Sequence, residues 1–275
     1  MNLKQKKIIK TIIMSATIII ILLPIIFPLY FVLISSLKNM ADVYQLPPKL
    51  FGFQPIFDHY KYIFETQHYG IYMWNSAIIA VTSTLFSMLI SIPAAYAISR
   101  YKMNKVMMST LVVRLLPNIS ILIPFYYVYS KIGLVDTYFG LGLANSIPAI
   151  STTVWIMAGF VADIPYDLEE AAIVDGCTRQ GAFRRIILPV SVPGLVTCAT
   201  LAFLTTWNNF QYPLILGGQK TQTLPVSLQY FVSGSGVKWG RMLAATMVVI
   251  LPTIILTMLL QKYIVKGLTA GAVKG

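Results

Sequence analysis

Residues 11–37 read TIIMSATIIIILLPIIFPLYFVLISSL, 27 consecutive positions without a charged side chain. A helix of about 20 apolar residues crosses the roughly 30 Å core of a bilayer, so this stretch is long enough to span a membrane. Lysines precede it, as in a secretory signal, but the apolar region of a signal is only about 7 to 15 residues long. We therefore predict an uncleaved transmembrane helix, with a signal peptide as the alternative.

The rest of the chain has the same apolar character. Its 275 residues are 57% hydrophobic and 11% charged, whereas a soluble domain carries about 25% charged residues. Further apolar stretches of suitable length lie near residues 71–98, 106–130, 138–162, 186–215 and 242–261. The sequence predicts an all-α membrane protein with about six transmembrane helices. At this low charge density, the net charge of +12 indicates contact with membrane lipid, and no nucleic acid is expected as a partner.

The basic residues predict the orientation. With six spans, thirteen of the 21 Lys and Arg residues fall on the side of the two termini, seven fall on the opposite side, and Arg114 lies inside a span. Because cytoplasmic loops carry the excess of basic residues, both termini are expected in the cytosol. We predict one transmembrane domain over residues 1–275, with a core region at about 70–265, a cytosolic loop at 163–185 and long external loops at 38–70 and 217–240.

Several kinds of chemistry are excluded by absent residues. No Gly is followed directly by Lys, so the chain has no phosphate-binding loop of the Walker A type. All nine acidic residues lie in loops or at the ends of spans, unlike the carboxylate relays of proton-coupled transporters. The only histidines, His59 and His68, lie without a Cys or acidic cluster at metal-ligand spacing. We expect no enzyme, no metal site and no cofactor bound by this chain.

The loop at 163–185 contains the strongest local pattern. Residues 164–176 read IPYDLEEAAIVDG, which predicts a short helix outside the membrane. Asp167 is expected to cap it with Glu170 in a capping box, and Gly176 is expected to end it in a left-handed conformation. A rigid helix of this kind fits a groove on a partner, and an amphipathic linker on the membrane surface is the alternative.

This loop resembles the EAA loop of ABC importer permeases. The matching residues are Glu170, Ala171, Ala172, Asp175, Gly176, Phe183, Leu188 and Pro189. Four more stretches look like the maltose-type carbohydrate-uptake permeases, namely GLVDTYFGL at 133–141, WNNFQYPL at 207–214, TLP at 223–225 and GLTAGAVKG at 267–275. Asn209 departs from the family, which often has Glu there, and so does the pair Cys177 and Thr178.

The resemblance implies a type I ABC importer permease fold in a bacterial cell membrane. Such a subunit pairs with a homologous second permease, forming a heterodimer, while two ATPase subunits use ATP and Mg and an extracytoplasmic binding protein delivers the sugar. The ATPase-coupling residues would be Glu169 and the matching residues of the EAA loop. In similar permeases the tail, here Gly271, Lys274 and Gly275, contacts the ATPase subunits; a disordered end is the alternative.

The sequence offers two regions for a substrate path. Aromatic and amide side chains, which together suit a sugar, occur at Trp207, Asn208, Asn209, Gln211 and Tyr212; an interfacial aromatic belt is the alternative.

The second region lies in the predicted third and fourth spans. Arg114 is a charge inside the third span, and Asn118 follows one helical turn later, on the same face. Arg114 would meet either an anionic substrate or a structural partner. Trp155 would either stack on sugar or pack in the core.

Other functions remain open at this stage. One alternative is an importer of the same architecture for another solute, such as a polyol, glycerol phosphate, an acidic sugar or a peptide. A second alternative, from a different class of protein, is a stand-alone channel or carrier, which would need no ATPase.

Overall fold

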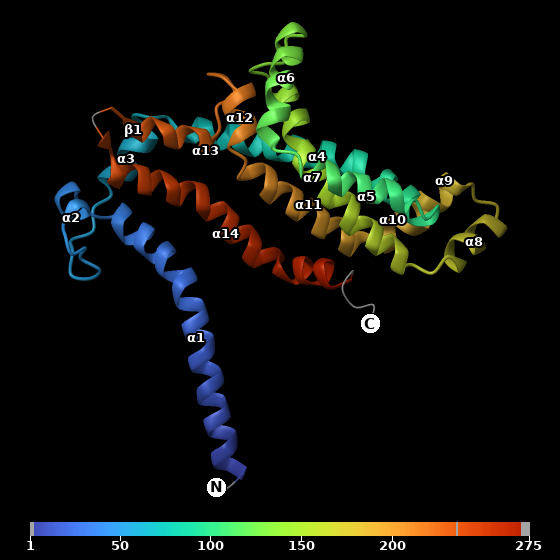
Figure 1. Ribbon diagram of the computed structural model, residues 1–275, viewed down its shortest axis with the longest axis horizontal. Helices are drawn as coiled ribbons and strands as arrows, with labels where there is room; N and C mark the ends of the chain where they lie inside the picture. Colours follow the sequence, from blue (N-terminus) through green and yellow to red (C-terminus); the bar gives the residue numbers. More distant parts are fainter. Residues whose placement is uncertain (1–2, 235, 271–275) are drawn as a thin grey trace. The chain divides into compact units, whose positions relative to one another are not determined.

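The computed structural model describes residues 3–234 and 236–270, and it is almost entirely helical (Figure 1). The predicted tail residues Gly271, Lys274 and Gly275 lie outside this described part. The long helices are α1 (Leu3–Ser36), α4 (Tyr69–Arg100), α7 (Tyr138–Asp163), α11 (Val192–Trp207) and α14 (Trp239–Ala270). The chain divides into two compact units, one of residues 1–69 and 228–250 and the other of residues 70–227 and 251–275.

The first unit holds α1 and the loop that follows it. Short helices α2 (Met40–Tyr44) and α3 (Asp58–Glu65) follow α1. A second segment of this unit contains the 3₁₀ helix η2 (Leu228–Phe231), a hairpin of β1 (Val232–Ser233) and β2 (Gly236–Val237), and the start of α14. The Tyr44 hydroxyl donates to the Val237 carbonyl at 2.6 Å, and Tyr69 packs against Phe231. The two segments are therefore joined by specific contacts.

The second unit has its core around α7. This helix packs along α11, and thirteen of its residues are buried. Two glycines allow helices to approach α7 closely. A Cβ at Gly142 would lie 2.5 Å from Thr82 Oγ1 on α4, and one at Gly194 on α11 would lie 2.6 Å from the ring of Phe160. Small residues of this kind are typical where helices pack inside a membrane.

Among the residues that the structure describes, four helices are long and apolar enough to cross a membrane without a bend. They cover Lys10–Ser36, Tyr69–Arg100, Tyr138–Asp163 and Trp239–Tyr263. Two further spans exist only if bent pairs of helices are each taken as one span. The structure therefore has four to six candidate spans, and the predicted six are reached when each bent pair is one broken span.

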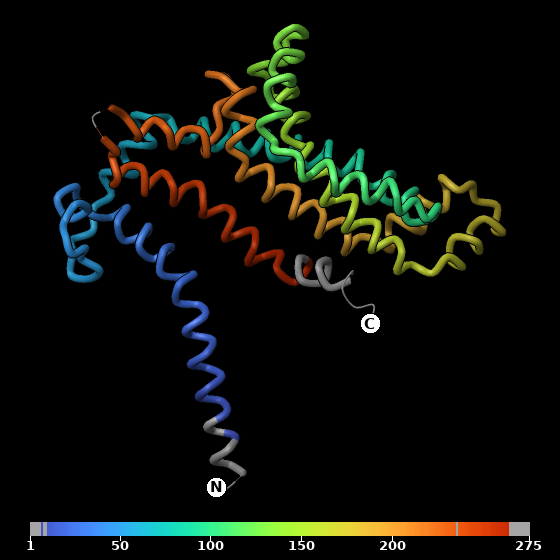
Figure 2. Tube along the Cα trace, in the orientation of Figure 1, coloured from blue at the N-terminus to red at the C-terminus, as the bar shows by residue number. Residues whose placement is uncertain are grey.

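The third predicted span is broken at Arg114. Helices α5 (Asn104–Val113) and α6 (Asn118–Lys131) meet at 87°, visible as a sharp turn in the green trace (Figure 2). Pro117 is the cause, because its ring disfavours helical geometry in the residue before it and it has no N–H to donate. A continuous span over 106–130 was wrong, and Arg114 lies at the bend.

The fifth predicted span is also bent. The segment Arg179–Val190 contains α9 (Arg179–Ala182), the π-helix η1 (Phe183–Ile187) and α10 (Leu188–Val190), and it meets α11 at 76°. Pro189 and Pro193 have no N–H to donate to a carbonyl of the preceding helical turn. The π-helical turn η1, an irregularity of the helix, lies just before Pro189. The remaining short helices are α8 (Asp167–Val174), α12 (Gln211–Leu216) and α13 (Leu224–Ser227).

Candidate functional site

Helix α8 is the short helix that the sequence predicts in the 163–185 loop. It runs from Asp167 to Val174, and its N-cap is Tyr166, which makes no side-chain capping bond. The predicted capping box was therefore wrong, because Asp167 occupies the first helical position. Asp167, Glu169 and Glu170 lie in the first turn. There, their negative charges stabilise the helix by interacting with the positive end of its dipole.

The inward face of α8 is held by one buried carboxylate. Glu169 is 2% exposed, and its Oε2 accepts from Arg100 Nε at 2.9 Å. The Tyr96 hydroxyl donates to the other carboxylate oxygen, and Arg100 Nη1 donates to the Ile164 carbonyl at 3.2 Å. Since Tyr96 and Arg100 lie in the last turns of α4, this cluster fixes α8 against the end of that helix.

The end of α8 is as sharp as the sequence predicts. Gly176 has φ +89°, its N–H donates to the Ile173 carbonyl at 3.0 Å, and the Cys177 N–H donates to the Ala172 carbonyl at 2.9 Å. This pair of bonds is the Schellman motif, which satisfies the last free carbonyls of a helix. Gly176 therefore sets the direction in which the chain leaves α8.

The outward face of α8 is open and partly apolar. Val174 is 86% exposed, and Leu168 and Ile173 are also exposed. Glu170 and Ala171 are exposed between them, whereas Ala172 is buried with Glu169. Of the predicted coupling residues, Glu169 and Ala172 thus face the protein, while Glu170 and Ala171 remain available for contact.

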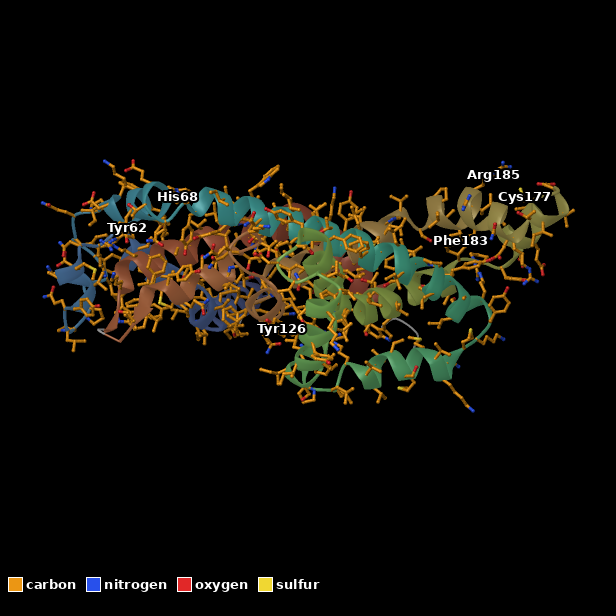
Figure 3. All side chains as sticks on the ribbon, turned by 90° about the horizontal axis from the view of Figure 1, so that it is seen from above. Tyr62, His68, Tyr126, Cys177, Phe183 and Arg185 are labelled. Atoms are coloured by element: carbon orange, nitrogen blue, oxygen red, sulfur yellow. The ribbon has the colours of Figure 1, made fainter. Side chains whose placement is uncertain are left out.

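The rest of the predicted loop motif joins α8 to α11. Phe183, labelled in Figure 3, packs against Tyr96 with ring centroids 4.8 Å apart. Ile187, between Phe183 and the Leu188 and Pro189 pair, is fully buried in a core cluster with residues of α4, α7 and α11. Asp175 is the exposed C-cap of α8. These contacts connect α8, η1 and the membrane helices as one packed body.

The predicted substrate stretch at 207–212 does not gather around one cavity. Trp207 and Tyr212 are buried, and Trp207 stacks on Phe203 at 5.8 Å between centroids. Asn208 Nδ2 donates to the Leu204 carbonyl at 2.8 Å, and Asn209 Oδ1 accepts from the Tyr212 N–H at 3.2 Å. Asn208 Oδ1 also accepts from the Thr253 hydroxyl of α14 at 3.3 Å. These four side chains therefore contact the ends of their own helices, the core and α14, and Gln211 remains exposed.

Arg114 lies in a different surrounding from the one the sequence suggests. Because the helix breaks after it, Arg114 and Asn118 do not share a helix face, so the predicted polar stripe was wrong. Arg114 Nη1 instead donates to Thr152 Oγ1 on α7 at 2.8 Å. Trp155 lies three residues after Thr152, on the same side of α7, and is 44% exposed. Arg114, Thr152 and Trp155 form what we call the α7 polar patch.

A clamp around Asp136 is a feature that sequence reasoning missed. Asp136 Oδ1 accepts from the N–H and the hydroxyl of Thr221, at 3.0 and 2.8 Å, and its own N–H donates to the Leu216 carbonyl at 2.9 Å. A Cβ at Gly218 would lie 2.7 Å from this carboxylate. The clamp joins residues 133–141 to the loop before Thr223, two stretches that the resemblance singled out separately.

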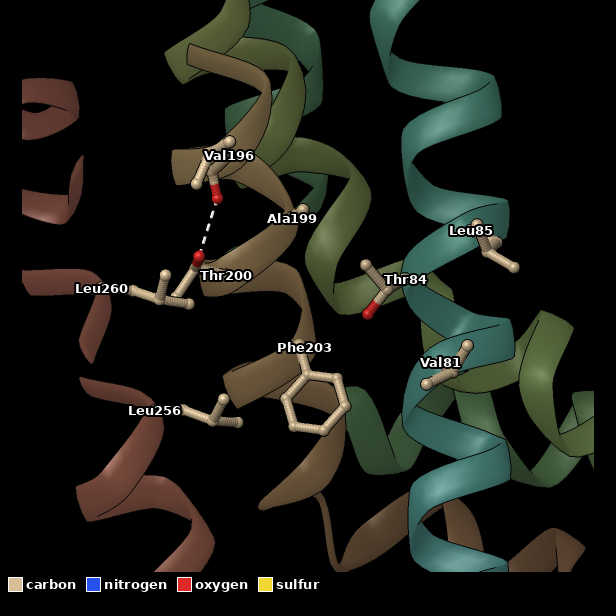
Figure 4. Close-up of a pocket in the computed structure, with 9 residues that line it drawn as sticks. All are labelled: Val81, Thr84, Leu85, Val196, Ala199, Thr200, Phe203, Leu256 and Leu260. Atoms are coloured by element: carbon tan, nitrogen blue, oxygen red, sulfur yellow. Dashed lines mark hydrogen bonds between the residues drawn. The ribbon is translucent and has the colours of Figure 1, made fainter. Parts of the chain in front are cut away.

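One apolar cavity opens in the second unit between α4, α11 and α14 (Figure 4). It measures about 390 Å³. Its two hydroxyls, on Thr84 and Thr200, donate to carbonyls of their own helices at 2.7 Å. A sugar site needs free polar groups to orient the hydroxyls of its ligand, so this cavity is not suited to a sugar.

The known proteins that this chain resembles agree with its fold and with the motif of the 163–185 loop. Residues 87–270 match the family described as the binding-protein-dependent transport system inner membrane component. The chain is 32% identical over 265 residues to the diacetylchitobiose uptake system permease protein DasC of Streptomyces coelicolor, covering 95% of this chain and 96% of DasC. It is 31% identical to the trehalose/maltose transport system permease protein MalG of Thermococcus litoralis, over 98% and 99% of the two chains.

A solved structure shares the fold. A chain in the crystal structure of a bacterial ABC transporter involved in the import of the acidic polysaccharide alginate aligns with a TM-score of 0.77 and 21% identity, over 94% of this chain and 97% of that one. The protein belongs to the family of inner membrane components of binding-protein-dependent transport systems. It is a multi-pass protein of the cell membrane and a permease subunit of an ABC importer, as its sequence predicts.

Proposed function

We propose that the chain is the membrane-spanning permease subunit of an ATP-driven importer for a sugar or oligosaccharide, and that α8 is the element on which an ATPase subunit docks. One observation carries the docking proposal. Helix α8 is fixed on its inward face by the buried Glu169 and Arg100 pair and exposes apolar side chains at Leu168 and Val174 on its outward face. Apolar side chains gathered on an exposed rigid element are typical of a protein interface.

The contacts of α8 suggest how docking moves the membrane helices. Glu169 connects α8 to the end of α4, and Phe183 and Ile187 connect the following turns to the core that α7 and α11 share. When the ATPase subunits close on ATP, a displacement of α8 is transmitted to these helices as a rigid-body movement. Such a movement opens the substrate path to each side of the membrane in turn.

The partners follow from this arrangement. The chain has no phosphate-binding loop of its own, so ATP and Mg are used by two separate ATPase subunits, and the permease is a non-catalytic subunit that binds no cofactor. A homologous second permease completes the path, and an extracytoplasmic binding protein delivers the solute. The termini and α8 then lie in the cytosol, where Gly271, Lys274 and Gly275 contact the ATPase subunits.

A sugar is the proposed solute because DasC and MalG are permeases for diacetylchitobiose and for trehalose and maltose. An acidic sugar is the second candidate, and Arg114 favours it. This cation is exposed and donates to Thr152, and the exposed Trp155 follows Thr152 by three residues. A guanidinium can pair with the carboxylate of an acidic sugar through charge-assisted hydrogen bonds. We propose that the α7 polar patch faces the substrate path, which the second permease completes.

Affinity purification tests the assembly. We expect the tagged chain, extracted from its native membrane in mild detergent, to carry one homologous permease and two ATPase copies. The variant Val174→Arg is expected to keep the second permease and lose the ATPase subunits, because the charge sits at the most exposed apolar position of α8. Recovery of the intact chain alone, monodisperse after gentle extraction, would contradict the proposal and favour a stand-alone carrier.

Substitution of Arg114 tests the polar patch. In Arg114→Gln we expect ATP hydrolysis stimulated by an acidic oligosaccharide to fall about tenfold, because a hydrogen bond to a charged group contributes about 1.5–3 kcal/mol. Stimulation by a neutral oligosaccharide should change by less than about twofold. The control Thr152→Val removes the bond to Arg114 and keeps the charge, so it should preserve the preference between the two sugars. Equal losses with both sugars in Arg114→Gln would assign the residue a structural role.

A further inference from the structure

The first unit contains a polar pocket that the transport mechanism does not use. It measures about 350 Å³ and is lined by Asn39, Met40, Ile56, Asp58, His59, Lys238 and Arg241. These residues come from the two segments of the unit, the loop after α1 and the start of α14. A pocket of this size accommodates a small polar group.

The walls of the pocket are fixed by contacts within the unit. His59 is buried, and its Nε2 donates to the Lys38 carbonyl at 2.8 Å. The first turn of α14 approaches this ring so closely that a Cβ at Gly240 would lie 2.3 Å from Nε2. The guanidinium of Arg241 lies over the ring of Tyr62, 3.6 Å from its centroid, and Tyr62 is labelled in Figure 3. The pocket is therefore formed before any ligand enters.

The charges of the pocket favour an anion that also carries a hydrogen-bond donor. Lys238 and Arg241 have no carboxylate within 4 Å among the residues that the structure describes. Asp58 is the one acidic side chain of the lining. Asn39 Oδ1 already has a hydrogen-bond partner, because it caps α2 by accepting from the Asp42 N–H at 2.8 Å. Two cations and one carboxylate suit a phosphate with a hydroxyl group attached nearby.

The position of the pocket along the chain indicates where such a ligand comes from. One membrane-spanning stretch ends at Ser36 and another begins at Trp239, so both meet the pocket within a few residues. Trp239 is exposed, and exposed Trp is typical of the membrane–water interface. The pocket thus lies at the depth of lipid headgroups, where the charged groups of Lys and Arg can pair with lipid phosphates.

We propose that this pocket binds the phosphodiester headgroup of an anionic glycerophospholipid. The phosphate contacts Lys238 and Arg241, and a hydroxyl of the headgroup donates to Asp58. The acyl chains extend along the apolar surface of the neighbouring spans. The bound lipid then holds the loop after α1 against the start of α14.

Native mass spectrometry of the purified complex tests the proposal. After washing in detergent, the wild-type complex is expected to retain one phosphatidylglycerol per copy of this chain, and the variant Lys238→Gln/Arg241→Gln is expected to retain it about tenfold less often. Arg241→Lys keeps the charge and should retain most of the lipid. The matched control is Lys131→Gln, which removes another cation that lies over a tyrosine ring, that of Tyr127 at 4.4 Å. It should behave as the wild type.

Further arms distinguish the sources of the phosphate. In nanodiscs of phosphatidylcholine alone, added glycerol 1-phosphate at millimolar concentration should not occupy the pocket of the wild type, because it lacks the acyl chains that give the lipid its local concentration. Binding of the free phosphate without lipid would overturn the assignment to a headgroup. Equal retention of phosphatidylglycerol by the wild type and the double glutamine variant would also overturn it. The assignment would likewise be overturned if the double glutamine variant retained the lipid normally but lost affinity for the binding protein. In that case the pocket would be a contact for that protein.

Discussion

We expect Gly176→Val to lower the substrate-stimulated ATP hydrolysis of the assembled importer at least about tenfold, and Gly176→Asn to lower it less than about threefold. The structure gives the reason. Gly176 has φ +89°, which a β-branched residue adopts only with strain and which asparagine tolerates much better. Valine therefore breaks the Schellman motif that ends α8 and redirects the chain toward Cys177. The measurement is the ATPase rate with and without substrate, together with the amount of variant in the membrane.

The pair of variants separates the backbone from the side chain at this position. A Cβ at Gly176 would meet nothing within 4 Å, so crowding inside this chain does not distinguish valine from asparagine. We expect stimulated turnover to fall at least about tenfold in the valine variant and less than about threefold in the asparagine variant. Normal turnover with valine would show that the geometry after α8 is irrelevant to coupling, and equal loss with both would indicate direct contact with the ATPase.

The second large effect concerns the buried pair of Arg100 and Glu169. Arg100→Met and Glu169→Met, each alone, are expected to destabilise the protein by about 3–5 kcal/mol, because each leaves the other charge buried and unpaired. The side chains of Arg100 and Glu169 are only 10% and 3% exposed, so water compensates little. The thermal midpoint of the purified complex measures this loss.

The double variant distinguishes stability from coupling. In Arg100→Met/Glu169→Met no unpaired charge remains, and replacing a buried ion pair by apolar residues is often neutral. We expect the thermal midpoint to return close to that of the wild type. Stimulated ATP hydrolysis is expected to stay at least about fivefold lower, because the directional bonds that orient α8 on α4 are gone. A double variant as unstable as the single ones would contradict the explanation by unpaired charge.

Local patterns in the sequence predict local structure well in this protein. The 27 uncharged residues at 11–37 predict the first span, and Gly176 predicts the end of α8, because both depend on neighbouring residues alone. The N-cap was misplaced by one residue. Asp167 satisfies the cap pattern, but Pro165 and Tyr166 start the turn earlier and place Asp167 inside the helix.

Features that depend on distant residues could not be predicted in this way. Arg100 and Glu169 are 69 positions apart, and Asp136 and Thr221 are 85 apart. Hydropathy also gives no warning of a bend, since Pro117 lies in a mainly apolar stretch and Pro189 lies between Leu188 and Val190. The stretch at 207–212 has the composition of a sugar site, yet the amides of Asn208 and Asn209 bond to the ends of their own helices and to Thr253 of α14. Composition predicts which groups are present and leaves their partners undetermined.

The two faces of α8 differ in whether the fold of this chain depends on their residues. Glu169 and Ala172 belong to the interior of this chain, whereas Leu168, Glu170, Ala171 and Val174 are exposed. Since we propose that an ATPase subunit docks on this outer face, we expect substitutions there to alter which ATPase the permease binds and to leave its own folding intact. To power this permease with a foreign ATPase, we expect that the positions to exchange first are those on the outer face of α8.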